Sequence, residues 1–198
     1  DRLYAARPSA LGAATPSTVW GLDGVIDLQE VRSSRPDITA ALDDLGADIS
    51  VFDGGDLIAV GAPATGHWFL VRPNGELASS HPSGGVLSLS KALSARAIAG
   101  GLDRRDAGGF VSVDRLTRAV IGIQSNSLLD TDFGASGVIT LGNVFPEFDV
   151  SGTVGESVQT LANGSVAITD GATAQIFIVR PDGTPDTTLG ASNSGVLT

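Results

Sequence analysis

The sequence predicts an all-β fold made of repeated four-stranded antiparallel units, and three observations carry this prediction. Glycine (26 residues) and proline (9 residues) separate short runs of valine, isoleucine, leucine and threonine, as in strands joined by tight turns. An ungapped internal match with a constant offset of 108 residues relates the segment at 49–75 to the segment at 157–183. A glycine followed by two aliphatic residues and a threonine, serine or aspartate recurs about every 50 to 60 residues, at Gly24, Gly85, Gly137 and Gly195.

Two kinds of turn define the strands of each full unit. Asn163-Gly164, and Gly54-Gly55 in the earlier unit, supply the positive φ that a two-residue hairpin turn needs between the first two strands. Proline followed by asparagine or aspartate and then glycine, at 73–75 and 181–183, suits a reversal after the third strand. The glycine-anchored segment then supplies a short fourth strand.

The middle unit is shorter than its neighbours. Val120–Ile123 takes the place of the strand at 176–179, and Ser125-Asn126-Ser127 replaces the turn that contains proline. The hairpin shrinks to about Phe110–Val113, with its bend near Asp114-Arg115. We therefore expect one repeat domain, 1–198, composed of a half unit (1–28), a unit (29–89), a shortened unit (90–141) and a unit (142–198).

Two inserts are expected to be short helices and not strands. Asp37 can cap a helical turn in the segment 37–45, and the segment 91–99 is rich in alanine. Both are expected on the surface of the repeat array, although loops or bent strand beginnings are the alternative interpretation.

The segment 126–138 contains a recognisable string, Leu-Asp-Thr-Asp-Phe-Gly followed by Ala-Ser-Gly-Val. It resembles the bacterial delta-sixty repeat, a β-propeller-like family whose units carry an Asp-Gly turn, then Leu-Asp-Thr-x-Phe-Gly, then Gly-Gly or Ser-Gly before a strand with valine. A second copy at 182–190 has leucine in place of the phenylalanine, and in the unit at 74–86 the Phe-Gly portion is lost. The resemblance implies a β-propeller-like array of about three and a half blades, and extracellular or surface-associated bacterial proteins. It carries over no catalytic residue.

Three and a half blades leave the closure of the ring open, because a closed propeller normally has at least four. The chain can be cut from a longer propeller, or it can form a small open or four-bladed ring with one degenerate blade. Two copies can also complete a seven-bladed ring. In the fourth arrangement the blades dock laterally on a larger assembly and pair their exposed edges with another chain.

The charge of the chain excludes two classes of partner. Its net charge is −10, and the short basic stretch at 103–106 has carboxylates on both sides, so counterion release opposes nucleic-acid binding. The same acidity opposes docking on anionic lipid, and no apolar run approaches the roughly 18 residues of a membrane span. The partners that remain are proteins, a second copy of the chain, or a glycan.

The residues that the chain lacks also bear on its class. The absence of cysteine excludes a disulfide framework, thiolate catalysis and a cysteine zinc site. The sequence starts at Asp1 without methionine, so we expect a processed terminus or the boundary of a piece. A cysteine-free acidic repeat with such a start favours an exported bacterial protein that is secreted, periplasmic or on the cell surface.

Candidate catalytic residues are few. His67 and His81 are the only histidines, and a metal or catalytic pair needs a third ligand such as Asp53, Asp56 or Glu76. We favour structural roles, because His67 aligns with Gln175 and His81 with Leu189. No nucleophile elbow, phosphate loop or dinucleotide fingerprint is present, so neither an enzyme nor a cofactor is expected.

Asp130 and Asp132 are the candidate calcium ligands, because alternate residues of an extended segment offer their oxygens on one face. Turn capping by these aspartates is the interpretation that we favour. Trp20 and Tyr4 are candidates for partner binding, as amphipathic aromatic side chains of the first half unit. Trp68 aligns with Ile176 and is expected in the core.

The sequence therefore predicts a non-catalytic protein-interaction or structural module of an exported bacterial protein. Such a module can be an accessory subunit of a larger assembly. The alternative hypothesis is a lectin-like propeller that binds glycans, in which aromatic and Asp/Asn residues recur in each blade. The third is a hydrolase-type enzyme with an unidentified pair of carboxylates.

Overall fold

The computed structural model describes ten parts of the chain, and before residue 48 and at 154–156 it describes the backbone alone. The predicted helix at 37–45 and the predicted Gly54-Gly55 turn lie outside them. The described parts are 2–4, 6–8, 14–16, 25–27, 48–52, 56–106, 108–146, 154–171, 173–190 and 194–197.

Three four-stranded antiparallel sheets follow one another along the chain, and we name them blades I, II and III. The strands of each blade lie side by side in chain order. Blade I consists of β5 (Ile49–Phe52), β6 (Leu57–Ala62), β7 (His67–Val71) and β8 (Val86–Ser88). Blade II consists of β9 (Ala99–Arg104), β10 (Phe110–Asp114), β11 (Ala119–Ile123) and β12 (Val138–Thr140). Blade III consists of β13 (Val154–Thr160), β14 (Val166–Asp170), β15 (Gln175–Val179) and β16 (Val196–Leu197).

Two smaller sheets precede blade I. β1 (Arg2–Tyr4) pairs with β4 (Val25–Asp27), and β2 (Ala6–Pro8) pairs with β3 (Ala14–Pro16). β1 and β4 are antiparallel neighbours, as the third and fourth strands of each blade are. The chain is thus an all-β, propeller-like array, as its repeats predict.

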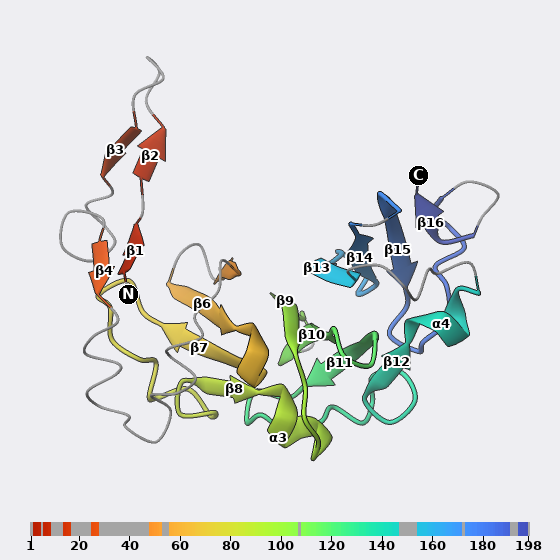
Figure 1. The fold of residues 1–198 in the computed structure, drawn as a ribbon, viewed down its shortest axis with the longest axis horizontal. Helices are drawn as coiled ribbons and strands as arrows, with labels where there is room; N and C mark the ends of the chain where they lie inside the picture. The colour runs from red at the N-terminus through yellow and green to blue at the C-terminus, as the bar shows by residue number, and fades with distance from the viewer. Residues whose placement is uncertain are drawn as a thin grey trace.

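The blades lie along an arc that is open on one side (Figure 1). β9 and β13, the first strands of blades II and III, lie on the inner side of the arc, and β8, β12 and β16 lie on the outer side. The N-terminal sheets stand at one end of the arc and β16 at the other. Each blade therefore has a leading face, turned toward the next blade along the chain, and a trailing face, turned toward the preceding one.

The glycines of the predicted turns have the expected positive φ, but Asn163 does not, so the turn between β13 and β14 is not the predicted two-residue turn. Gly164 has φ 81° in the connection between β13 and β14, and its N–H donates to the carbonyl of Leu161 at 2.8 Å. After the third strand, Gly75 and Gly183 have φ near +90°. Their N–H groups donate to the carbonyls of the arginines three residues earlier, at 2.9 Å in both blades.

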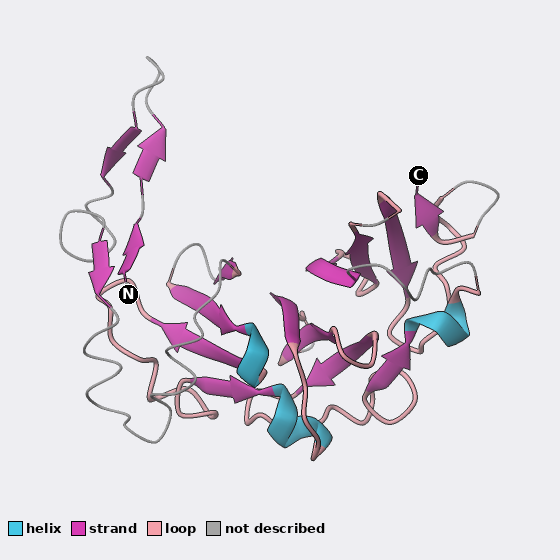
Figure 2. Ribbon diagram, viewed as in Figure 1, coloured by secondary structure: helices cyan, strands magenta, loops and turns pink. Residues whose placement is uncertain are grey.

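The described helices are short: α3 (Leu89–Leu93) and α4 (Leu141–Val144) follow the outer strands β8 and β12, and a 3₁₀ helix lies between β6 and β7 (Figure 2). The helix predicted at 91–99 begins earlier and is shorter, since α3 spans Leu89–Leu93. Ser88 caps it by accepting a hydrogen bond from the Lys91 N–H, and Ser94 ends it with φ 50°. A 3₁₀ turn (Pro63–Thr65) and α4 (Leu141–Val144) were not predicted. None of the helices in the described parts has the length and apolar character of a membrane span.

Two hydrophobic clusters fill the spaces between neighbouring blades. Burying each large aliphatic or aromatic side chain contributes about 1.5–3 kcal/mol, so these interfaces are the main source of stability. Between blades I and II the cluster includes Trp68, Leu70, Leu87, Phe110, Ile121 and Ile123. Between blades II and III it includes Val111, Val113, Val120, Phe133, Ile139, Val158, Val166, Ile168, Phe177 and Val179.

The inner strand β9 was not predicted, because its sequence Ala-Gly-Gly-Leu-Asp-Arg has low β propensity. A Cβ atom on Gly101 would lie 2.7 Å from the backbone nitrogen of Val158, so only glycine permits the approach of β13. Asp103 accepts hydrogen bonds from the backbone N–H of Thr160 at 2.6 Å and from the amide of Gln159 at 2.9 Å. The neighbouring blade therefore holds β9 in its extended conformation.

Candidate functional site

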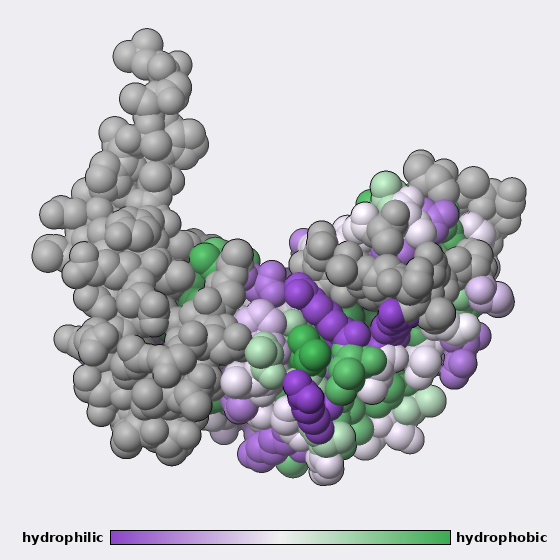
Figure 3. Space-filling view, in the orientation of Figure 1, coloured by the Kyte–Doolittle hydropathy of each residue, from purple (hydrophilic) through white to green (hydrophobic). Residues whose placement is uncertain are grey.

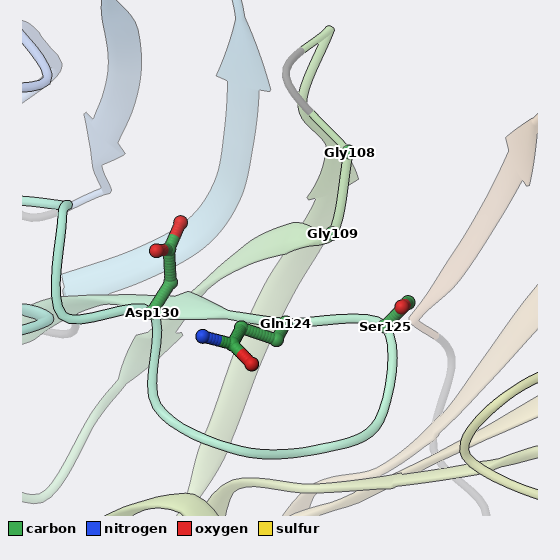
Figure 4. Close-up of a pocket in the computed structure, with 5 residues that line it drawn as sticks. All are labelled: Gly108, Gly109, Gln124, Ser125 and Asp130. Carbon is green, nitrogen blue, oxygen red and sulfur yellow. The ribbon is translucent and has the colours of Figure 1, made fainter.

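A cavity of about 290 Å³ opens between two loops of blade II (Figure 4). Gly108 and Gly109 line it from the connection between β9 and β10. Gln124, Ser125 and Asp130 line it from the loop between β11 and β12. The lining offers an amide, a hydroxyl and a carboxylate and includes no aromatic side chain, so it suits a small polar ligand better than stacking on a sugar ring.

The carboxylate in this cavity already has a partner. Arg105, which precedes the glycine pair, forms an ion pair with Asp130 and thereby joins the two loops. The guanidinium of Arg105 also lies 4.9 Å from the centre of the Phe133 ring. Asp130 therefore fixes the loop between β11 and β12 against the loop between β9 and β10.

Asp186 occupies the place in blade III that Asp130 has in blade II. Its carboxylate accepts hydrogen bonds from Thr188 Oγ1 at 2.6 Å, Ser165 Oγ at 2.7 Å and Asn163 Nδ2 at 3.0 Å. These hydrogen bonds, that of Thr188 first, hold the pKa of Asp186 well below its usual range, while desolvation acts in the opposite direction. The aspartate joins the same two loops in blades II and III.

The two calcium candidates are neighbours in a turn. The backbone N–H of Asp132 lies 3.4 Å from Asp130 Oδ1, and the other Asp130 oxygen faces Arg105. Asp132 is exposed. The described residues contain no group of three histidine, aspartate or glutamate side chains that could hold a metal ion. Calcium binding by this pair stays a prediction, and the arginine competes with any cation for the shared oxygen.

Two further buried aspartates end the second strands of blades II and III. Asp114 accepts hydrogen bonds from the backbone N–H of Ile98 at 2.9 Å and from Thr117 Oγ1 at 2.5 Å. Asp170 accepts one from Thr173 Oγ1 at 2.8 Å. In both blades an aspartate thus accepts a hydrogen bond from the threonine three residues later and shapes the turn between the second and third strands.

The two histidines lie in different environments. His67 begins β7, and desolvation lowers its pKa although a hydrogen bond with the backbone of Thr65 acts to raise it. His81 lies in the loop after β7, where its Nδ1 is 2.8 Å from Ser83 Oγ. Its ring centre is 5.8 Å from that of Phe110 in blade II, and burial lowers its pKa. The structure thus places His81 in an interface between blades.

The aromatic candidates have different outcomes. Trp68 is buried in the cluster between blades I and II, as predicted. It also lines a cavity of about 80 Å³ among the inner strands. Tyr4 lies in β1, whose backbone alone is described, and pairs with Val25. Trp20, like the possible histidine partner Asp53, lies outside the described residues, so partner binding by Trp20 and Tyr4 stays a prediction.

The contact between blades II and III depends on residues whose role sequence analysis missed. Phe133 of the Asp-Thr-x-Phe-Gly string is fully buried on the leading face of blade II. A Cβ on Gly122 would lie 2.6 Å from Phe133 Cβ, so the ring needs a glycine beside it. The next residue, Gly134, donates its N–H to the carbonyl of Pro181 in blade III at 2.7 Å. The recurrence of this string before each fourth strand was the signal for an interblade junction.

Apolar side chains remain exposed at both ends of the array. Ile49 and Val51 of β5 are each half exposed, and Leu189 and Leu197 of blade III are also exposed. Over the described part of the face drawn in Figure 3, hydrophobic and hydrophilic residues are interspersed. Leu116 and Leu128 of blade II are half exposed as well, so exposed apolar side chains occur along the array and not only at its ends.

No protein-family model matches the chain, and no curated protein matches it. Solved structures do. A protein of unknown function from Bacteroides caccae matches with a TM-score of 0.42 and 17% identity, over 67% of this chain and 41% of that one. Virginiamycin B lyase from Staphylococcus aureus matches with a TM-score of 0.48 and 14% identity, over 72% and 40%. This chain thus spans about two fifths of either protein. The lyase activity belongs to the Staphylococcus protein.

Proposed function

We propose that this chain is a non-catalytic interaction or structural module of an exported bacterial protein, and that its ligand is another protein. The observation that carries this proposal is that Ile49 of β5 is 50% exposed at a position where Leu102 of blade II and Val158 of blade III are buried against the preceding blade. Apolar groups at positions built for a blade interface favour a macromolecular partner over a small substrate.

Two buried aspartates support the same proposal, because turns and loop contacts engage their oxygens. Asp114 and Asp186 are buried and accept several hydrogen bonds each. A general acid or nucleophile needs an oxygen that is free to meet a substrate, and these oxygens are engaged. A polar cavity lined by loop residues remains, and a glycan there is the alternative that the experiment also examines.

The test is crosslinking of the purified chain to proteins of the source organism's cell envelope and culture medium, followed by mass spectrometry of the linked peptides. Lys91 is the only lysine, so a photoreactive residue is introduced at position 49 and, as the control, at the equally exposed leucine of position 128. We expect links from position 49 to a defined protein and few from position 128. Specific binding on a glycan array, or glycosidase activity, with no protein crosslinks would contradict the proposal.

A further inference from the structure

We propose that the cavity of blade II binds a small neutral polyol, whose adjacent hydroxyl groups form hydrogen bonds with Asp130 and Gln124. This inference is independent of the proposed protein partner and assigns the chain a second kind of ligand. It follows from comparing the cavity with the same place in blade III. Every described residue that lines the cavity belongs to blade II, so no neighbouring blade is needed to complete the lining.

Blades II and III can be compared at a constant offset of 56 residues. Asp130 and Asp186 each donate a backbone N–H to a carbonyl of the third strand, at 2.9 and 2.8 Å. In the loop between the first two strands, Gly108 and Gly164 each donate to the carbonyl three residues earlier, at 3.0 and 2.8 Å. The two loops of either blade therefore share these backbone hydrogen bonds, and the blades differ here in their side chains.

In blade III, side chains of the loops themselves surround the aspartate. Asn163 Nδ2 and Ser165 Oγ donate to one oxygen of Asp186, at 3.0 and 2.7 Å. Thr188 Oγ1 donates to the other oxygen at 2.6 Å, and a guanidinium nitrogen of Arg180 lies 3.4 Å from it. Neutral amide and hydroxyl groups thus supply the shortest hydrogen bonds to this carboxylate.

Blade II lacks these neutral side-chain donors. At the three positions the sequence has Ala107, which lies outside the described residues, Gly109 and Asp132. Asp130 Oδ2 forms the ion pair with Arg105, whereas Oδ1 has, among the described residues, one contact, with the backbone N–H of Asp132 at 3.4 Å. Since a carboxylate oxygen can accept two hydrogen bonds, Asp130 keeps acceptor capacity beside a cavity of about 290 Å³.

Blade I has no carboxylate at this place. Ala78 takes the position of the aspartate, and its N–H donates to the third-strand carbonyl of Leu70 at 2.8 Å, as in the other two blades. Of the three described blades, blade II is therefore the one that combines an incompletely engaged carboxylate with an open cavity.

The rest of the lining indicates the class of ligand. Gln124 and Ser125 line the cavity beside Asp130 (Figure 4), and their side chains have no hydrogen-bond partner among the described residues. Both can donate and accept. Because Arg105 neutralises Asp130, a neutral ligand avoids the cost of desolvating an unpaired charge. Adjacent hydroxyl groups supply the donors that blade III takes from its own loop, and their oxygens can accept from the amide.

The test is a titration of the 198-residue chain followed by two-dimensional ¹H–¹⁵N NMR, with D-glucose, D-galactose, D-mannose and myo-inositol as probes. Ligands of about 12 non-hydrogen atoms are expected to bind with a Kd on the order of 1 mM. We expect at least one probe to shift the amide signals of Gly108 and Gly109 in a saturable way. Binding of the methyl α-glycosides as well indicates the end of a glycan as the source of the hydroxyls, and binding of the free compounds alone indicates a free polyol.

Asp132→Thr tests the comparison between the blades directly. It introduces the hydroxyl that Thr188 directs at Asp186, so it is expected to occupy the open oxygen of Asp130. Binding should be at least tenfold weaker than in Asp132→Val, which has the same shape without the hydroxyl.

A second pair of variants examines the amide in the cavity. Gln124→Ala is expected to weaken binding at least fivefold. Gln175→Ala, which changes a partly exposed glutamine of blade III, is the control and is expected to bind like the wild type. Circular dichroism and thermal unfolding confirm that each variant is folded.

If no probe at about 20 mM shifts the signals of Gly108 and Gly109 in a saturable way, the proposal is overturned without any variant. Binding that Asp132→Thr and Gln124→Ala both leave unchanged also overturns it, because the ligand then lies elsewhere. Either result leaves the proposed interaction function standing, since crosslinks from position 49 do not depend on this cavity.

Discussion

At the scale of single residues, one loop position shows that a larger side chain in one place is matched by a smaller one beside it. His81, Phe133 and Leu189 hold the same place in the loops of blades I, II and III, and each donates its backbone N–H to the carbonyl of the residue three positions earlier. Phe133 is the largest of these three loop residues, and it lies against the smallest possible third-strand residue, Gly122. The position that histidine occupies in blade I is therefore occupied by an apolar side chain in blades II and III.

We predict that His81→Phe removes part of the acid sensitivity of the fold. Burial, and secondarily Arg104, lower the pKa of His81 below 6.5, so the folded chain favours the neutral ring. The unfolded chain then binds more protons as the pH falls through 6.5, and stability decreases below that pH. A phenylalanine keeps the contact with Phe110 and cannot be protonated.

The measurement is the melting temperature at pH 7.5 and at pH 5. The drop between the two is expected to be smaller for His81→Phe than for the wild type. His81→Gln is the matched control, since it also removes the titrating group but loses the aromatic contact. It should share the flatter pH dependence and be less stable at both pH values. An unchanged drop in both variants would refute this role for His81.

At the scale of elements, β11 and the loop that follows it are fitted to each other by Gly122 and Phe133. Gly122→Ala places a Cβ 2.6 Å from Phe133 Cβ and is expected to lower the free energy of unfolding by about 1–3 kcal/mol. In the Gly122→Ala background, Phe133→Leu relieves the clash, because blade III combines Ile178 with Leu189 at these places.

Urea unfolding of the wild type, both single variants and the double variant measures this coupling. The double variant is expected to be at least about 0.5 kcal/mol more stable than the sum of the single changes predicts. Additive losses would mean that the ring and the third strand do not compete for the same space.

The same scale shows what the sequence could and could not predict. Proline, glycine and asparagine determine local backbone geometry, so the turns at Gly75 and Gly183, the place of the turn at Gly164 and the fourth strands after the glycine anchors were correct. The two-residue form predicted for Asn163-Gly164 was wrong. β9 was missed because its extended form depends on its pairing with β10 and on contacts from blade III, and not on the β propensity of its own residues. The helix predicted at 91–99 is shorter because Ser88 and Ser94, polar residues outside the alanine-rich run, set its ends.

At the scale of the whole molecule, each blade is stabilised by its immediate neighbours through two separate clusters. We predict that Val158→Ala, which shortens a buried side chain between blades II and III, lowers stability by about 2 kcal/mol. In a stack of repeats the loss is felt mainly next to the altered contact.

Hydrogen exchange with mass spectrometry tests this. Protection of β14 and β15 is expected to fall more than protection of β6 and β7. Val60→Ala, a buried valine of blade I, should give the reverse pattern. Equal loss of protection in all three blades would show that the array unfolds as one cooperative unit.

The candidate site was less predictable than the fold. Repeat alignment shows that Asp130 and Asp186 are equivalent, but it does not show that Arg105 and Ser165 donate to them, because these partners lie in the loop between the first two strands and differ in residue type between the blades. The exposed position of Ile49 also had no local signal. It became visible only when Ile49 could be compared with the covered residues Leu102 and Val158.

The hydrogen bond from Gly134 to Pro181 joins two backbone groups, and this has an evolutionary consequence. A junction of this kind requires only a glycine on one side and a turn carbonyl on the other. Neighbouring units therefore need no matched side chains to form it. A duplicated unit arrives with both halves of the junction. Gene segments that encode such units can therefore gain or lose copies, and diverge afterwards, without rebuilding the joints between the copies that remain.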